Sequence, residues 1–312
     1  MKLTVASSPH IRGDFRTSRL MLDVVLSLMP ALFVGIFVLG PQAALVTVVS
    51  VVTAVAAEWL YEIVMKKRVT LKDCSALVTG LLLALTLPAT TPLWMVALGS
   101  AFAIVVAKLM WGGLGQNVFN PALAARAFLM VLFPAALTRY AGVDAATGAT
   151  PLHHLVMLTP PDQSILDMFL GNCPGSIGEL SALALLLGGA YLVFRKVISI
   201  RIPAAYIGTV AVLTLVFSKG DNALEWMLYQ LFSGGIMLGA IFMATDYATS
   251  PVTSLGQILF GIGCGILTVI FRYYGLFPEG VTSAILLMNL LTWAIDRYTP
   301  PRRFGTKKGG AA

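Results

Sequence analysis

Charged residues are scarce in this sequence. Only 11% of its 312 residues are charged, whereas 58% are hydrophobic and the mean hydropathy is +0.86. Soluble domains carry about 25% charged residues, so the composition excludes an ordinary soluble domain and indicates an integral membrane protein. The formal net charge is +7, but the basic residues form short clusters between apolar segments. That pattern is typical of membrane-protein loops and argues against a nucleic-acid partner.

Cysteine and histidine are also rare. Cys74, Cys173 and Cys264 lie far apart and show no CxxC spacing, so an iron–sulfur cluster owned by this chain, which normally needs four ligands, is not expected. The histidines are equally few and no HExxH motif is present, so neither a zinc site nor a haem is expected. The chain also lacks a short apolar segment with a small-residue cleavage site. Its first apolar segment is therefore predicted to be a membrane helix and not a removed signal peptide.

Apolar segments long enough to cross about 30 Å of hydrocarbon recur along the chain. They predict an all-α integral membrane protein with about ten transmembrane helices. The predicted helices span residues 20–40, 43–65, 74–87, 93–110, 121–138, 177–194, 203–218, 223–243, 255–273 and 280–296. The predicted organisation is an N-terminal segment (1–19), a first five-helix repeat (20–138), a loop (139–176), a second five-helix repeat (177–297) and a basic tail (298–312).

The connecting segments differ in charge. An even number of helices puts both termini on the same side of the membrane. The basic residues on that side form clusters within 2–19, 66–72, 195–201 and 297–308. The opposite side holds only Arg139, Lys219 and Arg272. The positive-inside rule therefore predicts that both termini are cytoplasmic and that the loop 139–176 is extracytoplasmic.

Two distant segments resemble each other. Residues 80–92 and residues 235–251 each run from a glycine through an apolar stretch to a break that ends in proline. About twenty residues later, each copy reaches a Gly-Leu pair before another helix. With five helices in each half, the second half is inverted relative to the first. This predicts the inverted-repeat plan of transporters, in which broken helices place polar backbone near the midplane. Coincidental similarity of apolar segments is the alternative.

One polar loop, Asp144-Ala-Ala-Thr-Gly-Ala-Thr150, has a distinctive pattern. Its form, Asp-x-x-(Ser/Thr)-Gly-Ala-Thr, resembles the site at which a flavin transferase joins FMN, through its phosphate, to the last threonine. The resemblance implies a covalent FMN on Thr150. Gly148 and Ala149 would leave the approach to the hydroxyl open, and Asp144 and Thr147 would position the loop for the transferase. A solvated turn is the alternative, because Gly, Thr and Asp are common turn residues.

Motifs between about residue 5 and residue 298 carry a wider resemblance. They are Ser7-Ser-Pro-His-Ile11, Thr17-Ser-Arg19, the glycine-rich run 112–122, Gly171-Asn172, Gly175-Ser-Ile-Gly-Glu179, Phe242-Met-Ala-Thr-Asp246, Glu279-Gly-Val281 and Met288-Asn289. Together they resemble the D subunit of the Rnf-type ion-translocating electron transport complex. The B subunit of the sodium-translocating NADH:quinone reductase is a close relative, but its extended N-terminal arm is missing here, which favours the Rnf side.

The resemblance implies a function. It implies a subunit of an ion-translocating oxidoreductase of the bacterial cytoplasmic (inner) membrane, in which electron transfer between ferredoxin and NAD drives Na⁺ or H⁺ transport. The covalent FMN would relay electrons, and family analogy allows a second, non-covalent flavin. The implied partners are other membrane, flavin and iron–sulfur subunits, a flavin transferase and the lipid bilayer.

This chain itself shows neither cluster ligands nor a GxGxxG motif after a strand. Ferredoxin and nicotinamide binding are therefore expected in partner subunits, and this chain is expected to hold no catalytic residue of its own. A flavin-free channel or permease for a small polar solute or ion is the alternative function, because inverted five-helix repeats also build such proteins.

Two further segments are candidate cofactor sites. Ser176 and Glu179 are expected at the start of a helix, where free backbone N–H groups suit a phosphate or another anion. A plain N-cap at Ser176, with Glu179 completing a capping box, is the alternative. Asn117, Asn120 and Arg126 belong to a stretch that resembles the family's cofactor or ion region. For Arg126, snorkelling to the interface is the alternative.

Carboxylates within apolar segments are candidates for an ion path. Glu58 and Glu62 are spaced i, i+4 and share a helix face, with Glu58 the deeper of the two and the better candidate. Glu62 is close enough in sequence to pair with Lys66 at the interface. Asp246 ends a helix at a broken segment, where a carboxylate and freed carbonyls can coordinate Na⁺. For each of these, an interfacial or salt-bridged role is the alternative.

Overall fold

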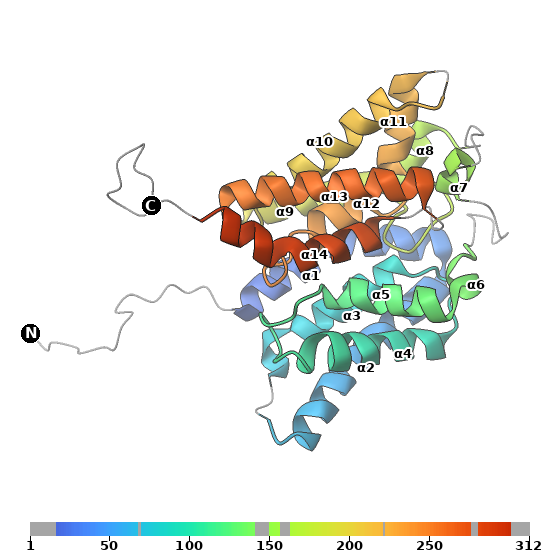
Figure 1. Ribbon diagram of the computed structural model, residues 1–312. Coiled ribbons are helices and arrows are strands. Elements are labelled where there is room, and N and C mark those ends of the chain that lie inside the picture. The colour runs from blue at the N-terminus through green and yellow to red at the C-terminus, as the bar shows by residue number, and fades with distance from the viewer. Residues whose placement is uncertain are drawn as a thin grey trace, which may run out of the picture.

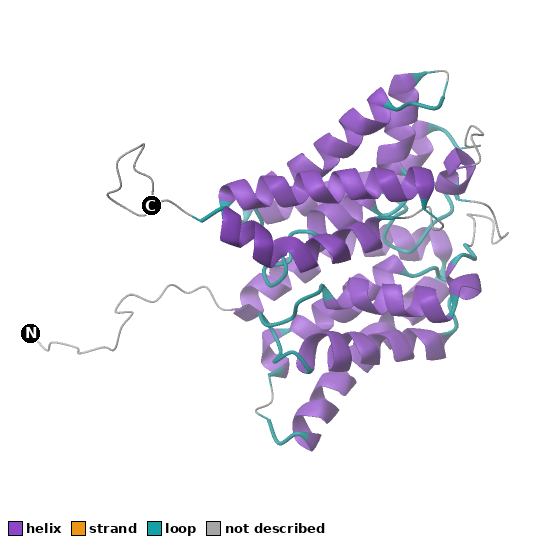
Figure 2. Cartoon of the chain, viewed as in Figure 1, coloured by secondary structure: helices purple, strands orange, loops and turns teal. Residues whose placement is uncertain are grey.

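The computed structural model describes residues 17–67, 70–140, 150–156, 163–220, 222–275 and 280–300, and its ordered elements there are all helical (Figure 2). The first half contains α1 (Thr17–Leu39), α2 (Pro41–Val64), η1 (Leu71–Asp73), α3 (Ser75–Thr86), α4 (Leu93–Phe102), the π-helix η2 (Ala103–Leu109), α5 (Pro121–Leu132) and α6 (Pro134–Leu137). Short α7 (Pro151–Val156) and α8 (Ile165–Leu170) follow. The second half contains α9 (Ala182–Phe194), α10 (Arg201–Val216), α11 (Ala223–Phe232), α12 (Ile236–Leu238), the π-helix η3 (Gly239–Met243), α13 (Ser254–Tyr274) and α14 (Val281–Tyr298). The all-α fold is confirmed.

Proline and glycine set the first helix boundaries. α2 begins at Pro41, directly after Gly40, whose φ of 78° lies in the left-handed region. A proline at the first helical position costs no hydrogen bond, because that N–H has no partner within the helix anyway. α3 ends just before Leu87 and Pro88, since the residue before a proline is disfavoured in helical geometry. Residues 87–92 therefore separate α3 from α4.

The second broken helix is made by glycine. The apolar pattern predicts one helix over 223–243, but α11 and α12 are separated at residues 233–235 and bent by 64°. Gly234 has a φ of 66°, which a residue with a side chain adopts only with strain. The prediction of one continuous helix here is wrong, because the Gly234–Gly235 pair turns the chain before the apolar run resumes.

Two other predicted helices are too long. The helix predicted over 121–138 ends at Leu132, because Pro134 follows and α6 starts anew there. The helix predicted from residue 177 begins only at Ala182, with Ser181 as its N-cap; the Ser181 Oγ accepts from the Ala184 amide at 3.2 Å. Residues 175–180 form turns instead.

The helices form two groups that meet at the middle of the molecule (Figure 1). α2 packs against α3 and α4 in one group, and α10 packs against α11 and α13 in the other. α1 contacts α9, and α5 contacts α14, so these two pairs join the groups. One hydrophobic core cluster runs through both halves. The start of α1 and the end of α14 lie at one end of the bundle, while α6 and α7 lie at the other (Figure 1).

The outer surface is apolar. Among the described helices, α1, α2 and α13 are long and apolar enough to cross a membrane, and the bent pair of α11 with α12 and η3 adds a fourth if it is one span. Large apolar side chains point outward, including Phe37 at 90% exposure and Val131 at 79%. Exposed apolar surface on this scale indicates contact with lipid or partner subunits. The protein is an integral membrane protein, while the number of about ten spans stays a prediction.

Candidate functional site

A pocket lies between the two halves. Its cavity has a volume of about 70 Å³, and its walls come from α1, α3, η2, α5, α9, η3 and the residues before α5 and after η3. Apolar side chains such as Val24, Leu82 and Phe242 form much of the lining. The polar side chains of the lining are Ser75, Thr79, Lys108, Asn117, Asn120, Thr245 and Asp246. An apolar pocket with a few converging polar groups is typical of a cofactor or small-molecule site.

Asn120 fixes the pocket wall by joining the two halves. Its Oδ1 accepts hydrogen bonds from the amides of Ala122 (3.1 Å) and Leu123 (3.3 Å), so Asn120 is the N-cap of α5. Its Nδ2 donates to the Met243 carbonyl in η3 at 3.2 Å. The carbonyl and the NH₂ group of this buried side chain are thus both hydrogen-bonded within the protein. These bonds set the distance between α5 and the second half at the pocket.

Asn117 and Asp246 face each other across this junction. The side chain of Asn117 lies near enough to Asp246 to lower the pKa of that carboxyl, and its Nδ2 donates to the Phe119 carbonyl at 3.0 Å. Thr249 Oγ1 donates to Asp246 Oδ2 at 3.2 Å. Burial raises the pKa of the Asp246 carboxyl, in the loop after η3, above its usual range, although these hydrogen bonds act in the opposite direction. The two motifs that contain Asn117 and Asp246, far apart in sequence, therefore form one site.

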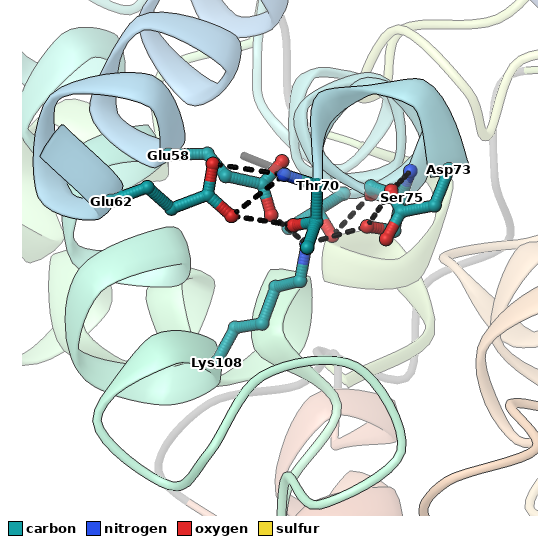
Figure 3. Close-up of polar contacts among 7 residues, drawn as sticks. Glu58, Glu62, Thr70, Asp73, Ser75 and Lys108 are labelled. Carbon is teal, nitrogen blue, oxygen red and sulfur yellow. Dashed lines mark hydrogen bonds and ion pairs between the residues drawn. The ribbon is translucent and has the colours of Figure 1, made fainter. Parts of the chain in front are cut away.

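Lys108 reaches the pocket from η2 and belongs to a buried polar cluster (Figure 3). Its Nζ donates to Glu58 Oε1 on α2 and to Ser75 Oγ on α3, each at 2.6 Å. The side chains of Lys108 and Glu58 are only 2% and 1% exposed. Ser75 Oγ donates in turn to Asp73 Oδ1 at 2.6 Å. Glu58 can be predicted from the sequence, because it lies deep within an apolar run. The sequence interpretation misses Lys108, although a lysine within the apolar run 93–110 indicates a buried partner.

Glu62 belongs to a separate branch of this cluster. Its carboxylate accepts from the Thr70 amide at 3.1 Å and from Thr70 Oγ1 at 2.5 Å. Glu62 is 2% exposed, and no ion pair with Lys66 forms among the described residues. The expected surface pairing is wrong, because Glu62 caps the chain where it returns toward α3.

Arg126 lies on α5 away from the pocket and holds the end of the first broken helix. Its guanidinium donates to the Thr86 carbonyl at the end of α3 and lies 3.8 Å from Glu179 Oε1. The two charged side chains are 6% and 7% exposed. Arg126 does not snorkel to the interface, because the free carbonyls of α3 and the Glu179 carboxylate provide its partners inside the protein.

The segment around Ser176 and Glu179 closes the same helix end. The amides of Ile177 and Gly178 donate to the carbonyls of Leu87 (3.1 Å) and Leu85 (2.8 Å). Gly178 approaches so closely that a Cβ would lie 2.7 Å from the Leu85 Cβ. The capping-box interpretation of Ser176 is wrong, since these amides bond to α3 and no helix starts here. The structure brings Glu179 and Arg126 together, but it places both outside the pocket.

The pocket includes Met21 and Val24 near the start of α1, whereas α7, which Thr150 directly precedes, lies at the opposite end of the bundle (Figure 1). Thr150 is half-buried and accepts a hydrogen bond from the His154 amide through its carbonyl at 3.3 Å. Leu152 and Leu155 anchor α7 by packing against Trp226 of α11. The other residues of the predicted attachment loop, Asp144, Thr147, Gly148 and Ala149, lie outside the described residues.

Comparisons with known proteins cover nearly the whole chain. A family model described as "NQR2, RnfD, RnfE family" matches residues 4–305. The chain is 46% identical to the D subunit of the Na(+)-translocating ferredoxin:NAD(+) oxidoreductase complex of Acetobacterium woodii, over 99% of this chain and 97% of that protein. It is 45% identical to the D subunit of the proton-translocating ferredoxin:NAD(+) oxidoreductase complex of Clostridium ljungdahlii, over 98% and 97%. Its identity to the D subunit of the ion-translocating oxidoreductase complex of Stutzerimonas stutzeri is 38%, over 94% and 93%.

Proposed function

The chain belongs to the NQR2, RnfD, RnfE family, and on this premise we propose that it is the D subunit of an Rnf-type complex that couples electron transfer between ferredoxin and NAD to ion transport. The names and full-length similarity of the relatives support this role. The relatives from A. woodii and C. ljungdahlii are named for Na⁺ and for protons respectively, at 46% and 45% identity. The proposal therefore includes either ion.

The observation that carries a redox role for this chain is the pocket between the halves. Its amide groups (Asn117, Asn120) and its carboxylate (Asp246) converge beside apolar walls. A flavin ring has the matching chemistry, with one polar, hydrogen-bonding edge and one apolar edge. We assign the second, non-covalent flavin to this pocket. When bound, it would supply one-electron and two-electron redox chemistry, while Asn117 and Asp246 would orient its polar edge.

The covalent FMN is assigned to Thr150. A phosphoester requires a threonine hydroxyl that a transferase can reach, and Thr150 is half-buried at the end of the bundle, before a short helix. The anchoring of Leu152 and Leu155 on α11 would keep the attached group against the second half. The pattern Asp144–Thr150 adds the sequence support for this assignment.

The sidedness follows from charge. We propose that both termini lie in the cytoplasm and that Thr150 lies outside it, because the basic clusters gather on the side of the termini in the predicted topology. In the structure, α1 begins and α14 ends at one end of the bundle, while α7 lies at the other (Figure 1). The two proposed flavins would then lie toward opposite membrane faces, as a subunit that passes electrons across the membrane requires.

A flavin-free permease is the competing function. The broken helices around Thr86 and Gly235 fit the plan of such a protein. The Arg126–Glu179 pair, however, fills the region between these two breaks, and the cavity there is only about 10 Å³. The geometry therefore favours the redox subunit.

Two flavin measurements on the complex purified with its transferase test the proposal. Flavin fluorescence that stays with this subunit on a denaturing gel detects the covalent FMN. Flavin released by acid from the same preparation, and lost in pocket variants, detects the non-covalent one. A subunit without in-gel fluorescence, in a complex whose acid-extractable flavin is unchanged in pocket variants, would refute the redox role and favour the permease.

A further inference from the structure

A chain of hydrogen bonds leads from the pocket to the end of the bundle. Lys108 lines the pocket, and its Nζ lies 2.6 Å from Ser75 Oγ. Ser75 Oγ lies 2.6 Å from Asp73 Oδ1 (Figure 3). Asp73 is half-buried in η1 and adjoins the exposed Lys72. Each separation is short enough for direct proton transfer between hydrogen-bonded groups, so the three side chains connect the pocket with the surface.

The other partner of Lys108 is incompletely satisfied. Glu58 Oε1 accepts from Lys108 at 2.6 Å, but Glu58 Oε2 is buried and has no hydrogen-bond partner among the residues that the structure describes. Leaving a charged acceptor unsatisfied costs stability, and apolar residues of similar size often replace a buried ion pair without loss. Stability alone therefore does not account for the pair. The pair fixes the side chain of Lys108, a residue that lines the pocket.

We propose that Asp73, Ser75 and Lys108 form the route by which protons reach the pocket, with Lys108 Nζ as the donor at the pocket wall. This inference rests on the proposed function, because it requires a pocket occupant that takes up a proton when it is reduced. The electrons come from the reductant of the complex. The route supplies only the proton.

The transfer balances at every atom. The Lys108 ammonium gives one proton to the occupant and becomes an amine. The amine then takes the Ser75 hydroxyl proton, since a hydroxyl can turn to donate to either neighbour. Ser75 Oγ recovers a proton from the Asp73 carboxyl, which takes one from water at the surface.

The other charged groups near the route are held apart from it. The oxygens of Glu62 accept from Thr70, so this carboxylate leads away from the pocket. Asp246 lines the pocket from the second half and accepts a hydrogen bond from Thr249 Oγ1. Ser75 is thus the single hydroxyl link between Lys108 and Asp73 among the described contacts.

The test removes that link in the intact complex. Ser75→Ala deletes the hydroxyl and leaves the Lys108–Glu58 pair in place, whereas Ser75→Thr restores a hydroxyl. Proton uptake is followed with a pH-indicator dye in weakly buffered solution after rapid mixing with reductant. We expect Ser75→Ala to slow uptake by about a hundred-fold, as loss of a positioned proton carrier typically does. Ser75→Thr should recover most of the rate, and Asp73→Asn should be as slow as Ser75→Ala.

Ser100→Ala is the matched control. Ser100 is a buried hydroxyl on α4 that bonds to Ser50 Oγ at 2.9 Å and to the Val96 carbonyl, outside the route, so uptake should keep the wild-type rate. Wild-type uptake in Ser75→Ala would overturn the route. Acid-extractable flavin is measured in every preparation. A complex whose acid-extractable flavin does not fall in Asp246→Asn contradicts the proposed pocket occupant, whereas the dye signal of Ser75→Ala judges the route separately.

Discussion

The two ends of this bundle are built in different ways. At one end, the pocket walls come from both halves, and Asn120 ties α5 to η3 through a buried hydrogen bond of 3.2 Å. At the other end, Thr150 stands before α7, which has only the residues Pro151–Val156 and rests on α11. A ligand at the first end can be surrounded by the protein, whereas a ligand at the second end has few described groups around it.

The two ends would therefore retain a cofactor in different ways. Surrounding walls bury most of a ligand and reduce its escape, so the pocket can hold a flavin by contacts alone. Among the described residues, no such enclosure surrounds the half-buried Thr150 that precedes α7, and the proposed covalent bond would replace it. Variants that affect one end and spare the other test this distinction.

The largest effect is expected at Thr150. Thr150→Val keeps the size of the side chain but removes the oxygen that would bear the phosphate. In-gel flavin fluorescence of this subunit should disappear completely, while the acid-extractable flavin stays at the wild-type amount. Thr138→Val, directly after α6, removes an exposed threonine hydroxyl outside the motif; it serves as control and should keep its fluorescence. A fluorescent Thr150→Val band would refute the attachment site.

Arg126 joins two segments that lie between the ends of the bundle: the end of α3 and the turn at Glu179. Arg126→Met leaves the buried Glu179 carboxylate without this ion-pair partner, and removing one member of a buried pair costs about 3–5 kcal/mol. Thermal unfolding in detergent should show the loss, and the double variant Arg126→Met/Glu179→Gln should regain part of it.

Arg195→Met provides the comparison for that result. Arg195 pairs with Asp23 at 3.2 Å, but its side chain is 52% exposed, so its loss should cost less than about 1 kcal/mol. Equal destabilisation by the two single variants would contradict the buried role of Arg126.

Asp246 distinguishes the pocket from the Thr150 end. Asp246→Asn removes a charged acceptor worth about 1.5–3 kcal/mol, so the acid-extractable flavin should bind roughly ten- to a hundred-fold more weakly. The in-gel fluorescence should not change. A variant that loses the in-gel signal but keeps the extractable flavin would reverse the assignment of the two sites.

The same variant carries a pH dependence. Because burial raises the pKa of Asp246 in the folded state, the wild type should lose stability as pH rises through that pKa, when the buried carboxyl must ionise. Asp246→Asn cannot ionise, so thermal unfolding of the variant should show a weaker decline over the same range. Parallel curves for the two proteins would contradict the raised pKa.

The smallest effect concerns the start of α9. Ser181→Ala removes the N-cap and should cost about 1 kcal/mol. Ser176→Ala should cost less, because the Ser176 Oγ is buried and has no hydrogen-bond partner among the described residues. Thermal unfolding compares the two, and a larger loss at Ser176 would mean that its hydroxyl is used.

The sequence predicts the helical elements well where apolar runs are bounded by proline, as at Pro41 and Pro88. It fails at 175–181, because the residues that decide this segment are the carbonyls of Leu85 and Leu87, far away in the chain. Motif resemblance finds Asn120 and Asp246, which do meet at the pocket. Lys108 is missed because its partners Glu58 and Ser75 lie on other helices, and sequence spacing gives no distance between helices.

The π-helix η2 (Ala103–Leu109) determines where Lys108 points. A π-helix carries extra residues relative to an α-helix of the same length, and each one shifts the following side chains by about 100° around the axis. Deleting Val106 would remove one such extra residue and turn the Lys108 side chain by about 100° around the axis, away from Glu58 and Ser75. One extra residue in η2 thus determines that a charged side chain lies at this pocket. Exchanging residues without changing the length of the helix would not have the same effect.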